Sequence, residues 1–157
     1  MSRRPITKAG YQNLMKELHR LKTSERLEII REIEAARAHG DLSENAEYEA
    51  AKEKQGYIEG KIADLENRLS FAEIIDLARL PRDRVVFGAW VRLLNVETDE
   101  EEIYQLVGPD ESDVEQRKIS VFSPLGKAVL GKEVDDTATV HAPRGIIEYE
   151  ILDISFD

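Results

Sequence analysis

Residues 48–72, YEAAKEKQGYIEGKIADLENRLSFA, carry the strongest periodic pattern in this chain of 157 residues. Side chains suited to a helix–helix seam recur at alternating intervals of three and four residues, which is the spacing of a coiled-coil helix. They are Tyr48, Ala51, Gln55, Ile58, Ile62, Leu65, Leu69 and Ala72. The pattern predicts a long helix that packs one face against a second helix.

The preceding segment, residues 7–39, has the composition expected of that second helix. It contains no proline and one glycine, and its apolar residues form a heptad that slips where glutamates occupy positions 25 and 28. The seam residues are Tyr11, Leu14, Leu18 and Leu21 before the slip, then Ile29, Ile33 and Ala36. We expect one helix with a local stutter, ended by Gly40. Because a short turn joins the two helices, residues 1–76 are predicted to form an antiparallel coiled-coil hairpin.

After Asp76 the pattern changes from helix to strand. Residues 77–84, LARLPRDR, are predicted to be a linker. Five runs of β-branched and aromatic residues follow, and we expect them to form antiparallel strands whose core includes Phe87 and Trp90. The runs are residues 85–94, 102–108, 118–122, 137–142 and 146–156.

One short helix is expected among these strands, in the run SPLGKAVLG. Ser123 is suited to the N-cap and Pro124 to the first helical position. The sequence thus predicts an α+β protein, with a long hairpin followed by a small antiparallel β domain over residues 85–157.

Composition excludes several classes of protein. The net charge is -10 with a pI near 4.9, and residues 77–157 alone hold 9 basic and 17 acidic residues, so broad charge-driven binding of nucleic acid is not expected. Without cysteine there is no disulfide, thiolate nucleophile or Cys-type zinc site. We interpret the three histidines, His19, His39 and His141, as unrelated surface groups. No leader or membrane-spanning segment is recognisable, which predicts a soluble, cytoplasmic protein.

Two acidic residues lie in the predicted turn, GDLSEN, at the end of the hairpin. Asp41 and Glu44 fit a capping pattern for the second helix, and they also could converge on one cation. Spacing alone favours the cap, because caps are common and paired carboxylates are seldom catalytic.

Several stretches resemble one protein family. The run EAARAHGDLSENAEYEAAKEKQGYIEGKI at residues 34–62 resembles the hairpin tip of the bacterial Gre transcript-cleavage factors, GreA type. The similarity continues through VFGAWV, VGPDE, ISVFSPLGKAVLGKE and EYEILDISF. It covers nearly the whole chain, in the order and spacing of the family.

The resemblance implies a C-terminal domain similar to FK506-binding proteins, and it implies a function. Gre factors bind backtracked RNA polymerase, insert the hairpin through its secondary channel and stimulate the polymerase's own cleavage of the nascent RNA 3' end. Asp41 and Glu44 match the two tip acids, which implies that they share a second Mg²⁺ with the polymerase. Such a factor is not an enzyme alone, binds no cofactor stably by itself and has no membrane partner.

Other residues acquire roles through the same resemblance. Arg37 and Lys52, near the tip, are candidates for contact with the RNA, with a solvated helix face as the alternative; Lys52 stands where the family often has arginine. Ser123 and Pro124 match a loop that docks on the polymerase, and Phe122 departs from the polar residue common before them. The basic patch of GreB-type members is missing, which favours the GreA type.

Two other functions remain as alternatives to a cleavage factor. An inhibitor that occupies the polymerase channel would be distinguished by altered tip acids, whereas here the tip matches the stimulating pattern. An adaptor would need an apolar stripe left free for its partner, whereas the visible stripe is used to pair the two helices, so we expect a monomer.

Overall fold

The computed structural model describes residues 3–38 and 46–156. Its contacts divide the chain into a hairpin unit, Tyr11–Phe71, and a sheet unit made of the residues up to Gly10 together with those from Ala72 onward. The sequence interpretation assigned residues 1–10 and 72–76 to the hairpin. The contacts group these residues with the sheet unit, because short strands formed by these segments pair with each other and the first contacts a loop of the sheet domain.

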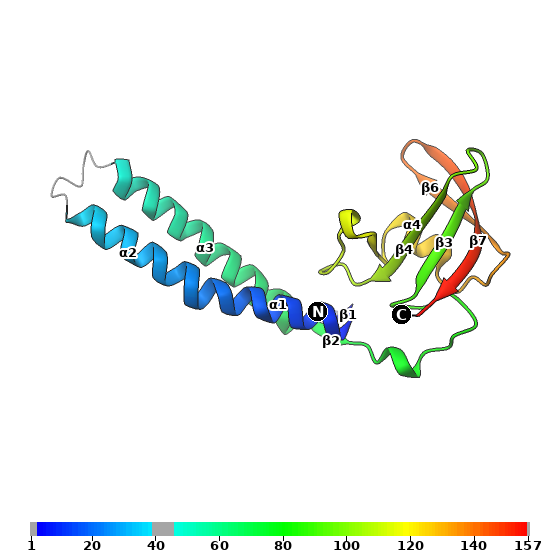
Figure 1. Cartoon of the computed structure of the whole chain (residues 1–157), viewed down its shortest axis with the longest axis horizontal. Coiled ribbons are helices and arrows are strands. Elements are labelled where there is room, and N and C mark those ends of the chain that lie inside the picture. Colours follow the sequence, from blue (N-terminus) through cyan, green and yellow to red (C-terminus); the bar gives the residue numbers. More distant parts are fainter. Residues whose placement is uncertain (1–2, 39–45, 157) are drawn as a thin grey trace. The chain divides into compact units, whose positions relative to one another are not determined.

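The hairpin unit is built as predicted from two antiparallel helical segments (Figure 1). The first consists of α1 (Lys8–Arg20), a π-helical turn (Leu21–Glu25) and α2 (Arg26–Arg37), and the second is α3 (Ala46–Ser70). Most of the predicted seam residues are confirmed as its core, but Tyr11, Tyr48, Gln55 and Leu69 are only partly buried, and Ala72 lies in a strand of the sheet unit. The buried members are Leu21, Ile29, Ala51, Ile58, Ile62 and Leu65, with Leu14, Leu18 and Ile33 packed against them.

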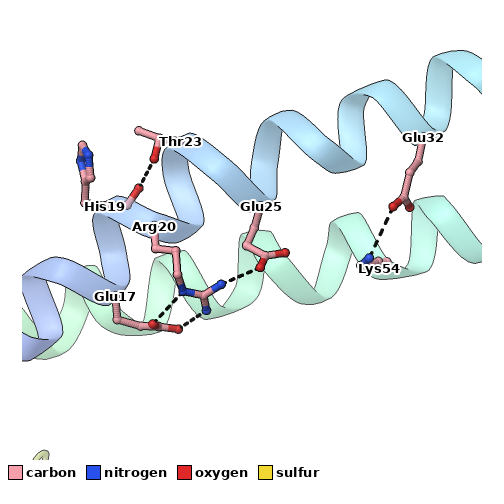
Figure 2. A network of polar contacts seen from close by, with 7 residues as sticks. All are labelled: Glu17, His19, Arg20, Thr23, Glu25, Glu32 and Lys54. Atoms are coloured by element: carbon pink, nitrogen blue, oxygen red, sulfur yellow. Dashed lines mark hydrogen bonds and ion pairs between the residues drawn. The ribbon is translucent and has the colours of Figure 1, made fainter.

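The π-helical turn lies where the sequence predicts a stutter. Leu21 and Ile29 both enter the seam although eight residues separate them, one more than a heptad. A π turn accommodates such a single extra residue by widening the backbone locally. Figure 2 shows side chains bridging this turn: the Arg20 guanidinium pairs with Glu25, five residues later, and with Glu17. The Thr23 hydroxyl donates to the His19 carbonyl oxygen (2.7 Å).

Ion pairs between the helices follow the antiparallel register. Arg26 makes two bonds to the Glu59 carboxylate (2.7 and 2.8 Å), and Lys22 lies 3.3 Å from Glu66. The hydrogen bonding between Arg26 and Glu59 raises the pKa of Arg26 and lowers the pKa of Glu59. Because these side chains are exposed, they contribute little to stability and mainly favour this register over others.

The sheet unit contains the five predicted strands. They are β3 (Trp90–Asn95), β4 (Glu101–Val107), β5 (Lys118–Ser120), β6 (Thr137–Ala142) and β7 (Gly145–Ser155), in the order β5-β4-β3-β7-β6. The short helix α4 (Pro124–Val129) is confirmed and contacts β6. The expectation that all strands are antiparallel is wrong for one pair. β5 is parallel to β4, because the ten-residue connection 108–117 is long enough to return the chain to the same direction.

The two aromatic residues predicted for the core have different surroundings. Phe87 packs against the core cluster, which is formed by residues such as Val91, Leu93 and Ile151. Trp90 does not belong to this cluster. It alternates along β3 with the buried Val91 and Leu93, so its half-buried side chain lies on the opposite face of the sheet.

Several three-residue elements were not predicted. β1 (Arg4–Ile6) pairs in parallel with β2 (Ala72–Ile74), forming a separate two-stranded sheet. Within the predicted linker, residues Leu77–Arg79 form a 3-10 turn capped by the Asp76 side chain. Three-residue elements are too short to show a periodic pattern, and Pro5 argues against a strand.

The VGPDE loop, residues 107–111, holds the start of the chain through two carboxylates, of which Asp110 pairs with Arg4 (3.0 Å). Glu111 accepts hydrogen bonds from the Thr7 hydroxyl, from the Thr7 N–H (2.8 Å) and from the Gly108 N–H (3.0 Å). The Thr7 hydroxyl in turn accepts from the Gly10 N–H (3.0 Å), so Thr7 caps α1. A side chain at Gly108 would collide with the Pro5 carbonyl oxygen, which explains the glycine there. We call this set of contacts the Glu111 clasp.

Deleting Ser24 tests the interpretation of the π turn. The deletion leaves Leu21 and Ile29 seven residues apart, which a regular α-helix accommodates with both side chains still in the seam. We expect the melting temperature, followed by circular dichroism at 222 nm, to stay within a few degrees of the parent. Deleting the exposed Arg31, between Ile29 and Ile33, should instead rotate the following seam residues outward. We expect this deletion to lower the melting temperature clearly. Equal losses from both deletions would contradict this explanation.

Replacing Glu111 tests the clasp. Glu111→Ala leaves the N–H groups of Thr7 and Gly108 without their acceptor, so we expect unfolding of the sheet unit to become easier by about 2–3 kcal/mol. Urea titration followed by the fluorescence of Trp90, the single tryptophan, reports on this unit. Glu115→Ala removes an exposed carboxylate from the same connection, residues 108–117, and should change the free energy of unfolding by less than about 0.5 kcal/mol. Similar values for both variants would show that the clasp is not stabilising.

Candidate functional site

The predicted tip acids lie just beyond the helix ends that the structure describes. α2 ends at Arg37 and α3 begins at Ala46, whereas Asp41, Glu44 and also His39 lie outside the described residues. Within residues 3–38 and 46–156 there is no group of three or more acidic, histidine or cysteine side chains arranged to hold a metal ion. Asp41 and Glu44 therefore remain a prediction from the sequence.

The two candidate RNA-contacting residues lie at the tip end of the hairpin, one on each helix. Arg37 is the last residue of α2, and Lys52 lies in the second turn of α3; both side chains are exposed. The Lys52 ammonium donates to the Gln55 side-chain oxygen (3.1 Å), within its own helix. The Arg37 cation at the C-terminus of α2 also interacts favourably with the helix dipole, whether or not it contacts RNA. The geometry is compatible both with RNA contact and with a solvated face.

The seam contains smaller side chains toward the tip. Large residues fill it farther from the tip, whereas Ala36 and Ala51 are buried at the tip end. A shallow hollow of about 390 Å³ lies beside them, lined by Glu32, Ala35, Ala36, Glu47, Ala50, Ala51 and Lys54. The buried part of the seam at this end is therefore made of small side chains.

Ser123 and Pro124 lie at the start of α4, and the chain there is fixed by hydrogen bonds. The Ser123 hydroxyl accepts from the Gly126 N–H (3.0 Å) and donates to the Ser120 carbonyl oxygen (2.6 Å). The Ser120 hydroxyl accepts from the Phe122 N–H (3.0 Å). The predicted capping role of Ser123 is confirmed, and Pro124 occupies the first turn with its ring exposed.

A hollow of about 370 Å³ opens beside this loop. Its lining residues come from the loop, from α4 and from the edge strand β6: Phe122, Pro124, Lys127, Ala128, Thr139 and His141. We call it the Phe122 hollow. Sequence reasoning identified Pro124 and noted Phe122, but it did not group Lys127 and His141 with them. These two lie on different elements, and only the packing of α4 against β6 brings them together.

No helix in the described part of the chain combines the length and the apolar character needed to cross a membrane.

Comparisons with known proteins place both units in one family. The family description "Transcription elongation factor, N-terminal" (GreA_GreB_N) matches residues 4–74, and "Transcription elongation factor, GreA/GreB, C-term" matches residues 80–156. The chain is 52% identical to "Transcription elongation factor GreA" of Thermodesulfovibrio yellowstonii, over 98% of this chain and 97% of that protein. For the protein of the same name from Syntrophus aciditrophicus the identity is 53%, over 98% and 96%.

Among solved structures, the chain is similar to the GreA factor homolog 1 (Gfh1) protein of Thermus thermophilus. The two are 32% identical, with a TM-score of 0.45, over 98% of this chain and 99% of that one.

Ser123→Ala tests the cap at α4. Losing the acceptor for the Gly126 N–H should lower the stability of the sheet unit by about 1 kcal/mol, measured by urea titration with Trp90 fluorescence. Ser112→Ala is the matched control, because its exposed hydroxyl makes only one long bond, 3.3 Å to the Pro109 carbonyl oxygen. If Ser123→Ala is no less stable than Ser112→Ala, the capping bond contributes nothing measurable.

Proposed function

This chain belongs to the GreA/GreB family of transcription elongation factors, and we propose that it stimulates RNA cleavage by a backtracked RNA polymerase. As a member of this family it acts on RNA polymerase during elongation and is not itself the catalyst. In the proposed mechanism the hairpin enters the secondary channel, and the polymerase cleaves the nascent RNA near its 3' end so that elongation resumes. The observation that carries the proposal is identity of about 50% with GreA proteins over nearly the full length.

The form of the hairpin supports insertion into a channel. A closed seam buries Ile29, Ile58 and Ile62, so the helices hold each other without help from a partner. The buried residues at the tip end, Ala36 and Ala51, are small, and small seam residues allow two helices to approach closely. An adaptor that binds through a free apolar stripe is less well supported. The exposed large apolar side chains of the hairpin are Met15, Leu27, Ile30 and Tyr57, and no single helix presents more than two of them. For the same reason we propose that the factor acts as a monomer.

The tip acids are proposed to complete the polymerase's active site. Carboxylate oxygens are the ligands that Mg²⁺ prefers, and Mg²⁺ retains several waters when only a few carboxylates bind it. A second metal ion in phosphodiester cleavage supplies charge stabilisation and an activated water. Asp41 and Glu44 would provide two ligands and orient that water, and the polymerase would provide the others. Two carboxylates alone are a weak set, which is why the free factor is not expected to retain the ion.

Two further contacts belong to the proposal. Arg37 and Lys52, exposed near the tip on opposite helices, would contact phosphates of the displaced RNA 3' segment. Ser123 and Pro124 would dock on the polymerase surface, where the hydrogen-bonded loop presents them without further ordering.

Amide variants of the tip acids separate catalysis from capping. Asp41→Asn keeps a good N-cap residue, and Glu44→Gln keeps the capping-box geometry, so both proteins should remain folded. If the acids hold the second Mg²⁺, each variant should lower the rate of stimulated cleavage by about tenfold or more. A high concentration of Mg²⁺ should partly restore the rate. Binding to the same backtracked complex should stay nearly unchanged. The rate is measured on end-labelled RNA.

Two controls make the test specific. Glu49→Gln removes one charge from an exposed acid in the first turn of α3 and should cleave like the parent. The factor with Mg²⁺ and free RNA, without polymerase, should leave the RNA intact. Normal stimulation by folded Asp41→Asn and Glu44→Gln would overturn the catalytic role and leave only the cap. A parent protein that binds the complex but suppresses cleavage would instead be an inhibitor.

A further inference from the structure

A cavity of about 540 Å³ opens on the sheet unit, and it is larger than either hollow described above. Three parts of this unit form its wall: residues 7–9 at the start of the chain, residues 74–78 after α3, and Gln105 of β4 with Lys118 of β5. Cavities of roughly 300–1,000 Å³ with a mixed apolar and polar wall are typical of small-molecule sites. The proposed function uses none of these residues, so the cavity is a separate feature. We call it the Lys118 cavity.

One part of the wall is apolar and open to solvent. Ile74 and Leu77 keep 48% and 37% of their surfaces exposed, although both are large apolar residues. Ala78 extends the same wall. Leu77 lies directly against the backbone of Gly88, where a Cβ atom would be 2.7 Å from the Leu77 side chain. An apolar or planar group that covers Ile74 and Leu77 removes their exposed surface from water, which is favourable.

Another part of the wall presents neighbouring polar side chains from two strands. Gln105 and Lys118 are partners in the register of β4 and β5, so their side chains lie next to each other on one face of the sheet. The Gln105 carboxamide nitrogen donates to the Gly88 carbonyl oxygen (3.2 Å), which orients the group. In the part of the chain that the structure describes, no donor reaches the Gln105 carboxamide oxygen. Such an oxygen can accept from the amino group of a nucleobase, as glutamine does with adenine.

The Lys118 cavity has a surplus of positive charge. Lys8 and Lys118 both line it, and neither ammonium group has an ion-pair partner among the described residues. Asp76 is the one acid among the described lining residues, and its carboxylate accepts from the Ala78 N–H (3.1 Å) and pairs with Arg79 (3.3 Å). Lys118 is half-buried, where charges interact more strongly than in open solvent. A group with two negative charges therefore complements the cavity.

We propose that the Lys118 cavity binds a mononucleotide, with adenine as the base that suits its wall. A phosphate monoester carries close to two negative charges at neutral pH and has three acceptor oxygens, which matches the two lysines. The planar base covers Ile74 and Leu77, and its amino group donates to the Gln105 carboxamide oxygen. A bound nucleotide joins residues 74–78 to β4 and β5 and thereby stabilises the sheet unit. The inference goes beyond the proposed function and does not rest on it.

Titration of the full chain with AMP, followed by calorimetry, measures the affinity. Adenosine and inorganic phosphate are titrated separately, and AMP should bind at least about tenfold more tightly than either, because the base and phosphate contacts act together. In an isotope-labelled sample, AMP should shift the amide signals of Ile75, Ala78 and Lys118, which line the cavity, and leave those of β6 unchanged. The midpoint of urea unfolding, followed by Trp90 fluorescence, should rise with the AMP concentration.

Three variants test the assigned contacts. Lys8→Glu and Lys118→Gln should each raise the dissociation constant of AMP by about tenfold, because each removes a charge-assisted hydrogen bond. The glutamate at position 8 lies in the first turn of α1, where the helix dipole favours an acid, so the fold should be kept. Ile74→Thr keeps a β-branched residue in β2 and should raise the dissociation constant by about threefold.

Matched variants outside the cavity provide the controls. Lys16→Glu reverses an exposed charge farther along α1, and Val114→Thr shortens another exposed apolar side chain. Both should bind AMP like the parent. Urea titration without ligand checks that every variant is folded.

Several results would overturn the proposal. The first is the absence of heat and of signal shifts at millimolar AMP, and the second is parental affinity for AMP in Lys8→Glu and Lys118→Gln. An equal loss in Lys16→Glu would show a response to net charge alone, and equal affinity for AMP and for phosphate or adenosine would show that only part of the wall is used. Because no measurement involves the polymerase, these failures leave the proposed function untouched, and a factor that does not stimulate cleavage leaves this proposal untouched.

Discussion

The apolar seam between the two helical segments is the interaction on which the hairpin depends. In proteins most helical stability comes from packing of one face, so burial of residues such as Ile29, Ile58 and Ile62 provides most of the stability of these helices. The seam also demands a continuous apolar face, and the extra residue between Leu21 and Ile29 would break that continuity in a regular helix. The π turn resolves this conflict locally. The burial of the seam residues toward the tip, including Ala36 and Ala51, depends on that correction of phase.

The sequence predicts those features that repeat. The hairpin seam, the five strands and the cap at Ser123 each follow from a period or a position-specific residue preference, and all are present. The phase slip was visible in the sequence, but periodicity does not show how the backbone absorbs an extra residue. The parallel β5 and the paired strands β1 and β2 are each three residues long, too short for a pattern. Trp90 was assigned to the core on apolar character, which does not identify the face of a strand.

The candidate site also has a part that the sequence predicts and a part that only the structure shows. The roles of Asp41 and Glu44 come from the resemblance and from the chemistry of carboxylates, and spacing alone favoured a cap. The Phe122 hollow could not be derived from the sequence, because Lys127 lies in α4 and His141 in β6, and the sequence does not show how these two elements pack. Only the contact between α4 and β6 makes them neighbours. Local capping residues are therefore predictable here, whereas a surface shared by distant segments requires the tertiary structure.

The two units meet different physical demands. A hairpin that enters a channel must be slender and must keep its seam closed, which restricts substitutions along one face of each helix and leaves the outer faces free for exposed ion pairs. In the proposed function the sheet unit binds a protein surface, although it carries most of the negative charge of the chain. Its acidity disfavours non-specific attachment to RNA and DNA, both of which surround a transcribing polymerase.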